Sequence, residues 1–267
     1  MTYRINYAYT CNTGKVRVNN EDNYWCCGEL LPAKNQGIDE IRTGVRLRES
    51  LPALAVFDGM GGESQGEMAA WLASDAMDRF YCGNKSLLRK KPERFLTEVS
   101  QSMNQAVCSY GRENRISAIG TTLAMIAFGK RAVNICNLGD SRIYRLTEGH
   151  FSQISRDHVL KNYMLGKPPL TQFLGIEEAE MKLEPTIAAL PYENGDRYLL
   201  CSDGVTDMLS DSEIEEIIRQ DVSVEDTVRI LRESVFGRGA RDNTTIILCE
   251  VELEECPLRT WLTQGKR

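Results

Sequence analysis

The stretch TTLAMIAFGKRAVNICNLGDSRIYRLTEGHFSQI, residues 121–154, decides the fold of this chain. Its hydrophobic pattern has a period of two, and turn signals that contain glycine interrupt the pattern. This predicts strands at Thr121–Phe128, Ala132–Leu138, Arg142–Leu146 and Phe151–Ile154. Strands so close in sequence must pair antiparallel, because a parallel crossover needs about a dozen residues or more.

Working outward, apolar residues before this stretch recur every three or four positions, which is the period of a helix. They form two sets: Met68, Leu72, Ala76 and Phe80, then Phe95, Val99, Met103, Ala106 and Tyr110. Further strands are predicted at Tyr3–Thr10, near Tyr24, and at Ala53–Phe57, Arg197–Cys201 and Thr244–Val251. Gly28–Ser50 is predicted to be a loop or a long hairpin, and Leu160–Pro185 to be irregular.

Two more helices are predicted in the C-terminal third. Ser210 and Glu213 have the spacing of a capping box, before a short helix that ends near Gln220. Apolar residues between Val224 and Val235 mark the second helix. This order predicts an α+β fold with sheets in the middle and helix pairs outside. We expect one domain over residues 1–255 and a short tail at 256–267, because no repeat or linker divides the chain.

Composition excludes several classes of function. The chain has 38 Asp and Glu against 32 Lys and Arg, a net charge of −6, so we expect no nucleic-acid partner. Apolar runs such as Leu123–Phe128 are far shorter than the roughly 20 residues that span a bilayer, so we expect no membrane partner. Met1–Thr10 lacks the apolar core of a signal peptide. We expect a soluble, cytoplasmic monomer.

Cysteine and histidine counts limit the chemistry further. The nine cysteines are odd in number and irregularly spaced, which argues against a disulfide scaffold or a zinc ribbon. Cys136, Cys201 and Cys249 lie in apolar runs and are expected to be buried. With only two His in the chain, any metal would be bound mainly by carboxylates, which favour Mg²⁺ or Mn²⁺.

Acidic residues stand at the ends of several predicted strands. They are the pair Glu21-Asp22, and Asp58, Asp140, Asp203 and Asp242. Each could be a turn residue and nothing more, since Asp-Gly is a common turn pair. If the carboxylates converge, however, they repel one another and need a cation. Their shared position at strand ends favours a divalent-metal site over independent turns, and both interpretations remain open at this point.

The acidic residues also lie in motifs that resemble those of the PP2C (PPM) family of metal-dependent protein serine/threonine phosphatases, in its bacterial form. In the order of the family, the motifs are Val16–Asp22, Asp58–Gly62, Gly120–Thr122, Gly139–Arg142, Asp157-His158, Ser202–Gly204 and Asp242-Asn243. The match extends from about residue 3 to about residue 252, which is nearly the whole chain.

The resemblance implies a four-layer α/β/β/α sandwich and two Mn²⁺ or Mg²⁺ ions, with a third ion in some bacterial members. By position, Asp58 would bridge two ions, the Gly59 carbonyl would bind one, and Asp203 and Asp242 would bind the other. Glu21, Asp22 and Asn243 would act through waters or hydrogen bonds around the ligands. Asp140, with Asp203, resembles the third-ion site, and Arg17 resembles the arginine that binds the substrate phosphate. The implied reaction is hydrolysis of phosphoserine and phosphothreonine by hydroxide bound to the two ions.

This chain departs from the family pattern in two places. Met60 stands where eukaryotic relatives have a histidine that protonates the leaving group, so a metal-bound water becomes the expected acid. Val159 replaces a small polar residue, which makes His158 as well explained by a structural role as by a catalytic one. Leu160–Pro185 corresponds to the variable flap of the family, and substrate choice cannot be deduced from it.

Two alternatives share this fold: a phosphoprotein-binding pseudophosphatase and a phosphomonoesterase that acts on small molecules. The presence of Asp58, Asp203 and Asp242 argues against the first, because a pseudophosphatase usually loses a metal ligand. Phosphorylated proteins are the expected partners, including a Ser/Thr kinase and its substrates.

Overall fold

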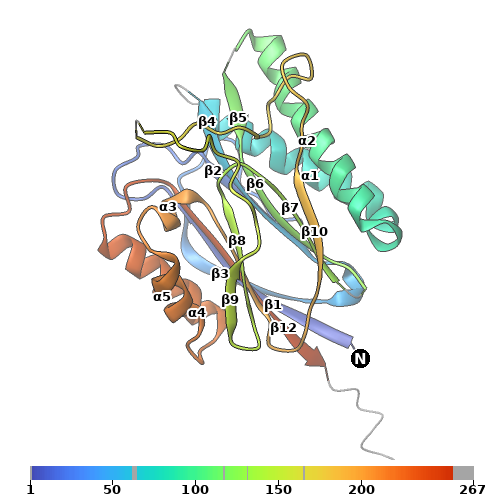
Figure 1. Cartoon of the computed structure of the whole chain (residues 1–267), viewed down its shortest axis with the longest axis vertical. Helices are drawn as coiled ribbons and strands as arrows, with labels where there is room; N and C mark the ends of the chain where they lie inside the picture. Colours follow the sequence, from blue (N-terminus) through green and yellow to red (C-terminus); the bar gives the residue numbers. More distant parts are fainter. Residues whose placement is uncertain (1, 62–64, 117, 131, 165, 255–267) are drawn as a thin grey trace, which may run out of the picture.

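Figure 1 shows the computed structural model, which describes residues 2–61, 65–116, 118–130, 132–164 and 166–254. Gly62 of the second motif and the predicted tail at 256–267 lie outside the described residues. One antiparallel sheet has the strand order β3 (Gly37–Leu47), β1 (Thr2–Asn12), β12 (Thr244–Glu254), β11 (Arg197–Cys201), β8 (Arg142–Thr147) and β9 (His150–Gln153). The other has the order β10 (Thr186–Pro191), β7 (Ala132–Leu138), β6 (Leu123–Phe128), β4 (Ala53–Gly61) and β2 (Asp22–Cys26), and β5 (Ile119–Thr121) pairs with β4.

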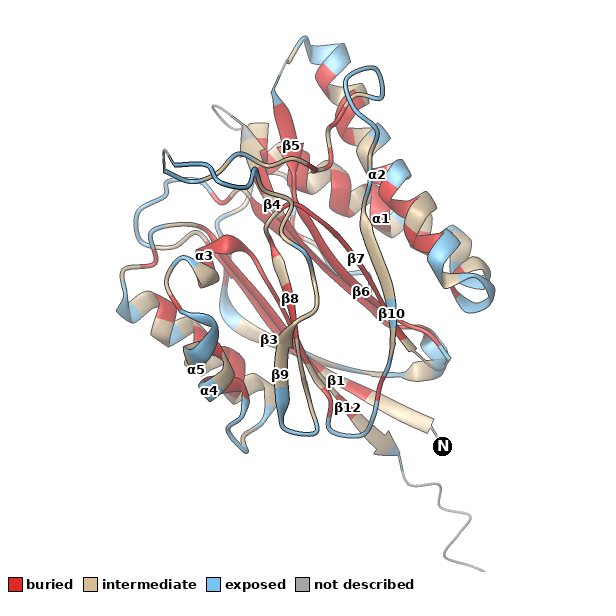
Figure 2. Cartoon of the chain, in the orientation of Figure 1, coloured by how far each residue is buried: buried red, intermediate tan, exposed pale blue. Residues whose placement is uncertain are grey.

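Helices cover the outer face of each sheet. They are α1 (Gln65–Lys90), α2 (Pro92–Asn114), the short α3 (Asp203–Thr206), α4 (Asp211–Ile218) and α5 (Val224–Gly237), with a 3-10 turn at Arg48–Ser50. One apolar cluster joins α1 and α2 to the β4–β6 side, and another joins α4 and α5 to the β11–β12 side. A third cluster fills the space between the sheets, where the strands are buried (Figure 2). The predicted α/β/β/α sandwich is confirmed.

Most predicted elements are present with small changes in their ends. Ala132–Leu138 has the predicted bounds, and the capping box of Ser210 and Glu213 starts α4. The predicted antiparallel pairing is confirmed for β6 with β7 and for β8 with β9. It is wrong for β7 with β8, because the turn at Gly139-Asp140 carries the chain from one sheet to the other. The predicted strand Thr121–Phe128 is two strands, because Thr122 turns its backbone and hydroxyl toward Asp58. In α1 the buried face is made of small residues such as Ala69 and Ala73, whereas Leu72 and Phe80 are only partly buried.

Two strands were not predicted individually. β3 lies within the segment expected to be a loop or a long hairpin, and it forms an edge strand whose residues are mostly exposed or half-buried. β10 is also an edge strand. A strand with one paired edge and little burial leaves a weak hydrophobic pattern in the sequence.

Candidate active site

The acidic motifs meet at one edge of the sandwich, where strands of both sheets end. Asp22 and Asp58 are directly opposite each other across β2 and β4 of one sheet. Asp203 follows β11 and begins α3, and Asp242 precedes β12, in the other sheet. Asp140 lies in the turn between β7 and β8, which belong to different sheets. The edge therefore collects carboxylates from both sheets.

Asp22 links the two sheets through hydrogen bonds. Its Oδ2 accepts from the hydroxyls of Ser202 and Thr245, both at 2.7 Å. The backbone N–H of Thr245 donates to Ser202 Oγ at 3.0 Å, so the two donors hold each other in place. Burial raises the pKa of Asp22 well above its usual range and the charge of Asp58 adds to the rise, while the two hydroxyls oppose it.

Asp58 is positioned by Thr121, the last residue of β5, and by Thr122, which follows it. Its N–H donates to Thr122 Oγ1 at 3.0 Å, and its carbonyl accepts from Thr121 Oγ1 at 3.0 Å and from the Thr122 N–H at 2.9 Å. Burial raises the pKa of Asp58 to about 7, and the charge of Asp140 contributes in the same direction. A cation beside this carboxylate would favour its charged form.

Gly59 lies where two backbones approach each other closely. A Cβ at this position would be 2.1 Å from the carbonyl oxygen of Gly66 in α1 and 2.5 Å from that of Glu21. The Gly59 N–H donates to the Glu21 carbonyl at 3.1 Å. Only glycine allows β4, α1 and the β1–β2 loop to meet here.

Asn243 anchors the loop that carries Arg17. Its Nδ2 donates to the carbonyls of Thr13 and Asn19, each at 2.9 Å, and its Oδ1 accepts from the Glu21 N–H at 2.8 Å. Arg17 Nη2 donates to Asp242 Oδ2 at 2.6 Å. The predicted phosphate-binding residue is therefore at the acidic edge, in contact with one of the predicted ligands.

A pocket of about 280 Å³ opens among the acidic residues. It is lined by Asp58, Met60, Thr122, Asp140, Lys167, Pro168, Pro169, Leu170 and Asp203. Lys167 Nζ lies 3.4 Å from Asp140 Oδ2 and also contacts Asp203 Oδ2. Among the described residues, no group of three or more Asp, Glu, His or Cys side chains is already gathered around one point. Two side-chain cations, Arg17 and Lys167, lie against three of these carboxylates instead.

His158 lies outside this pocket. The ring Nε2 of His158 is 3.0 Å from Thr186 Oγ1, and the backbone N–H of His158 donates to the Gly139 carbonyl at 2.9 Å. Burial lowers the pKa of the imidazole, so it is neutral at physiological pH. These contacts describe a residue that connects the turn of Asp140 to β10.

Three contributors were missed by sequence reasoning. Ser202 lies inside a quoted motif and Thr245 lies two residues after another, but neither was named as a site residue. Their donation to a buried carboxylate becomes visible only when β11 is paired with β12. Lys167 lies in an irregular segment that has no periodic pattern. The only local feature of the sequence there is a lysine followed by two prolines, Lys167-Pro168-Pro169, and such a combination is too common to indicate a site.

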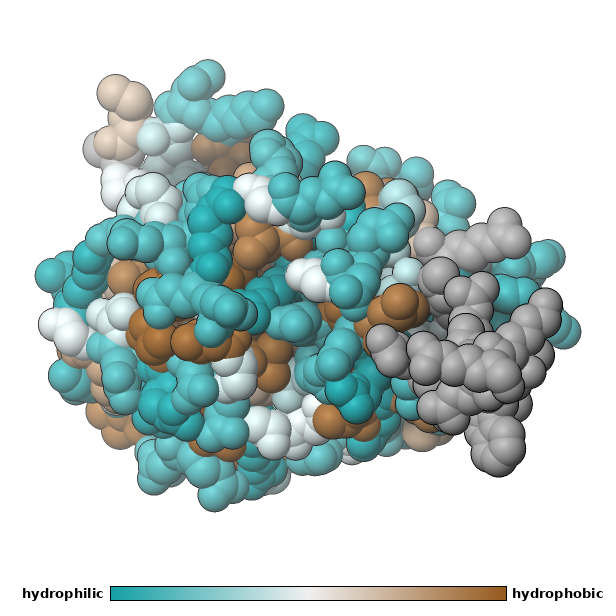
Figure 3. Space-filling model, turned by 90° about the horizontal axis from the view of Figure 1, so that it is seen from below, coloured by the Kyte–Doolittle hydropathy of each residue, from teal (hydrophilic) through white to brown (hydrophobic). Residues whose placement is uncertain are grey.

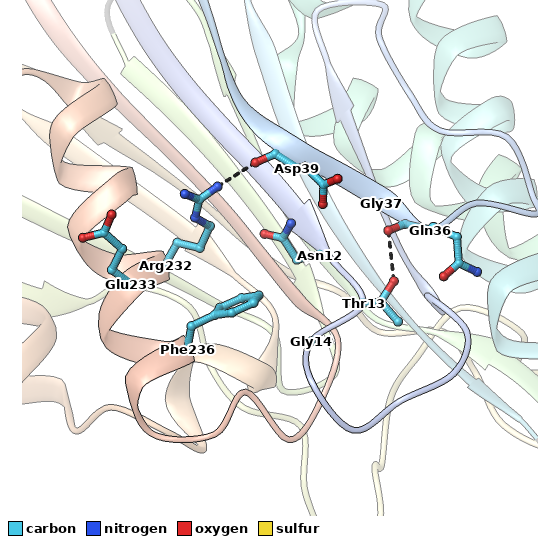
Figure 4. Close-up of a pocket in the computed structure, with 9 residues that line it drawn as sticks. All are labelled: Asn12, Thr13, Gly14, Gln36, Gly37, Asp39, Arg232, Glu233 and Phe236. Atoms are coloured by element: carbon cyan, nitrogen blue, oxygen red, sulfur yellow. Dashed lines mark hydrogen bonds between the residues drawn. The ribbon is translucent and has the colours of Figure 1, made fainter.

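A second cavity, of about 510 Å³, lies between the β1–β2 loop, β3 and α5. Figure 4 shows the Arg232 guanidinium donating to the Asp39 carbonyl at 2.7 Å, and the Thr13 hydroxyl donating to the Gln36 carbonyl at 3.0 Å. The cavity contains none of the predicted ligands.

The face seen from below is mostly hydrophilic, with brown apolar side chains between the hydrophilic ones (Figure 3). No helix among the described residues is long and apolar enough to cross a membrane.

An α/β/β/α sandwich that gathers aspartates at one edge is the architecture of the metal-dependent phosphatase class named above. The family model described as Protein phosphatase 2C matches residues 39–238. The chain therefore belongs to the protein phosphatase 2C family. This confirms the predicted family and the predicted class of enzyme, a protein serine/threonine phosphatase.

Individual relatives agree with this assignment. The chain is 28% identical over 261 residues to the serine/threonine phosphatase stp of Listeria welshimeri, with 92% of this chain and 95% of that protein covered. It is 29% identical to the serine/threonine protein phosphatase PstP of Mycobacterium tuberculosis over 94% of this chain and 46% of that longer protein. A crystal structure of the PstP catalytic domain with two manganese ions matches at a TM-score of 0.75 and 26% identity, covering 94% of this chain and all of that one.

Proposed function

We propose that this protein hydrolyses phosphoserine and phosphothreonine in proteins at the acidic edge, with two divalent ions as cofactors. The observation that carries the proposal is the meeting of Asp22 and Asp58, opposite each other in one sheet, with Asp203 and Asp242 of the other. Family membership and the manganese ions of the PstP catalytic domain support it.

The residues fit hard divalent ions. Carboxylate and carbonyl oxygens are the ligands that Mg²⁺ and Mn²⁺ prefer. Burial and then the charge of Asp140 raise the pKa of Asp58, and a bound cation would favour its charged form. We assign Asp58, the Gly59 carbonyl, Asp203 and Asp242 as ligands, and Asp140 as a ligand of a third ion. When bound, such ions lower the pKa of a water and neutralise phosphoryl oxygens.

Other residues act around those ligands. Asp22 and Glu21 contribute negative charge and hydrogen bonds, and Asn243 holds the β1–β2 loop in position. Arg17 would bind the phosphate. Its guanidinium has five N–H donors in a planar fork, and the hydrogen bond to Asp242 uses one of them, so the others can donate to phosphate oxygens. Met60 has no acidic proton, so its side chain does not protonate the leaving group.

The test is hydrolysis of p-nitrophenyl phosphate and of a phosphothreonine peptide with Mn²⁺, with Mg²⁺ and with EDTA. We expect activity on both substrates with metal and none in EDTA, and restoration by added Mn²⁺. Full activity in excess chelator would contradict the proposed chemistry. Binding of the phosphopeptide without turnover would indicate a pseudophosphatase, and turnover of metabolites alone would indicate a small-molecule phosphomonoesterase.

The biological setting stays a prediction. We infer that phosphorylated proteins are the partners, including a Ser/Thr kinase and its substrates, since the relatives are described as serine/threonine phosphatases. The cytoplasmic location and the monomeric state rest on the sequence alone.

A further inference from the structure

A lysine of the irregular segment between β9 and β10 lies inside the acidic site. Lys167 lines the same pocket as Asp58, Asp140 and Asp203, and its ammonium contacts the last two. The Lys167 side chain is 54% exposed, whereas the side chains of Asp140 and Asp203 are 13% and 10% exposed. A solvent-accessible ammonium therefore reaches two nearly buried carboxylates.

The loop that carries Lys167 is closed at its base next to the site. The Leu160 N–H donates to the Pro169 carbonyl at 3.0 Å, and the Thr171 N–H donates to the His158 carbonyl at 2.8 Å. This pairing closes a loop between residues 160 and 169, of which the structure describes 160–164 and 166–169, and the described part runs past the end of β4 (Figure 1).

The large apolar side chains in the described part of this loop are exposed. Leu160, Tyr163 and Met164 are 47%, 40% and 90% exposed. In the part of the loop that the structure describes, the ion pairs of Lys167 join it to the body of the sandwich. The lysine therefore holds the loop across the pocket.

The ammonium of Lys167 contacts the same carboxylates, those of Asp140 and Asp203, that would bind a divalent ion. The ammonium offsets the repulsion between Asp140 and Asp203 when no ion is bound. A divalent cation carries twice its charge and bonds directly to carboxylate oxygen. Because Lys167 contacts Asp203 Oδ2, an ion on that oxygen would lie close to the ammonium, and the two cations would repel each other.

We propose that Lys167 is a tethered cation that competes with a divalent ion for Asp140 and Asp203, so that metal binding there releases the 160–169 loop. The inference rests on the proposed function, because it takes these aspartates as ligands. The competition lowers the apparent affinity for the ion in proportion to the fraction of molecules in which the lysine has left. Metal concentration would then control how open the pocket is.

The experiment compares the full-length wild type with three variants. Lys167→Ala removes the cation, Lys167→Arg keeps the charge, and Lys161→Ala changes a lysine of the same loop that forms no ion pair among the described residues. Titration calorimetry with Mn²⁺ on chelator-stripped protein gives the affinities. Hydrogen exchange of the loop amides, with and without Mn²⁺, gives the state of the loop.

If Lys167 competes, Lys167→Ala tightens the weakest Mn²⁺ site by about tenfold, as for a lysine in contact in nine molecules of ten. Lys161→Ala and Lys167→Arg stay near the wild type. Mn²⁺ speeds exchange of the wild-type loop, whereas the loop of Lys167→Ala exchanges fast with or without metal. Equal Mn²⁺ affinities in wild type and Lys167→Ala, or a loop unaffected by both metal and mutation, overturn the inference alone. Failure of every variant to bind Mn²⁺ overturns the proposed metal site together with the competition.

Discussion

Asp22 and Asp58 face each other across β2 and β4, and their environments differ. Asp22 is fully buried and accepts two hydroxyl hydrogen bonds, whereas Asp58 lines the pocket beside Asp140. Under the proposed function, Asp58 would bind an ion directly and Asp22 would orient the ligands around it. The choice between turn residues and a metal site is open from sequence, and the proximity of these carboxylates in the folded chain supports the proposed metal site.

Asp58→Asn should abolish most of the activity. Asparagine keeps the shape but removes the charge that a bridging ligand supplies to both ions, a loss of several kcal/mol. At about 1.4 kcal/mol per decade this is roughly a thousandfold in kcat/KM. Steady-state kinetics with Mn²⁺ would measure it, and Asp221→Asn, at an exposed position between α4 and α5, is the control. Near-normal turnover of Asp58→Asn is incompatible with its assignment as a bridging ligand.

Arg17→Ala should act mainly on substrate binding. The guanidinium meets the phosphate in the ground state as well as in the transition state, so KM should rise more than kcat falls. Charge-assisted hydrogen bonds are worth about 1.5–3 kcal/mol, which corresponds to a rise of roughly ten- to a hundredfold. Arg17→Lys should restore part of the affinity, because lysine keeps the charge without the fork. An unchanged KM with a collapsed kcat would mean that Arg17 does not bind the phosphate in this way.

At the scale of elements, the backbone of Gly59 in β4 packs directly against the backbone of Gly66 at the start of α1. Gly59→Ala would force its Cβ into the Gly66 and Glu21 carbonyl oxygens. We expect a loss of about 1–3 kcal/mol in the free energy of unfolding, with weaker Mn²⁺ binding, because the strain falls on a predicted ligand.

Gly83→Ala is the matched control for this prediction. Gly83 lies inside α1, and a Cβ there would meet nothing within 4 Å. Alanine should leave the protein unchanged or make it more stable by up to about 1 kcal/mol. Urea unfolding of the metal-free variants checks both. If Gly59→Ala is as stable as the wild type and binds Mn²⁺ equally well, the close approach does not constrain the site.

The elements also show what a sequence can predict. β7 and β8 were predictable as strands because a period of two and a Gly-Asp turn act within a few residues, but their placement in different sheets was not. β3 was not identified as a strand because its pairing with β1 joins residues far apart in sequence, and most of its side chains are exposed or half-buried. The ligand candidates were visible because each aspartate adjoins a strand. Lys167 was not, because its position depends on how an irregular loop closes.

At the scale of the whole molecule, the site is also the place where the two sheets are joined by polar contacts. Ser202 and Thr245 of one sheet donate to Asp22 of the other. Arg142 of β8 donates to Asp157, which lies just before the flap at Leu160–Pro185. Buried charge without a cation opposes folding here, while the apolar clusters favour it. Global stability and metal binding are therefore coupled.

The metal-free protein should lose stability as the pH rises from about 4 to about 7. Burial and the charge of Asp140 raise the pKa of Asp58 to about 7, and burial raises those of Asp22 and Glu21 as well. Over this range the folded chain holds protons that the unfolded chain has released, so the free energy of unfolding falls with increasing pH. Urea unfolding in EDTA at pH 5 and pH 8 measures the difference.

Asp58→Asn should show a shallower decline than the wild type, and Asp221→Asn the same decline. Saturating Mn²⁺ should reverse the trend, because the ion binds the folded state alone and needs deprotonated ligands. Stability that rises with pH in EDTA, or a decline that Asp58→Asn leaves unchanged, would show that this carboxyl does not carry the uncompensated charge. The sign of the change in the free energy of unfolding with pH, in EDTA and in Mn²⁺, thus tests whether repulsion between the buried carboxylates destabilises the metal-free fold and whether bound metal removes that destabilisation.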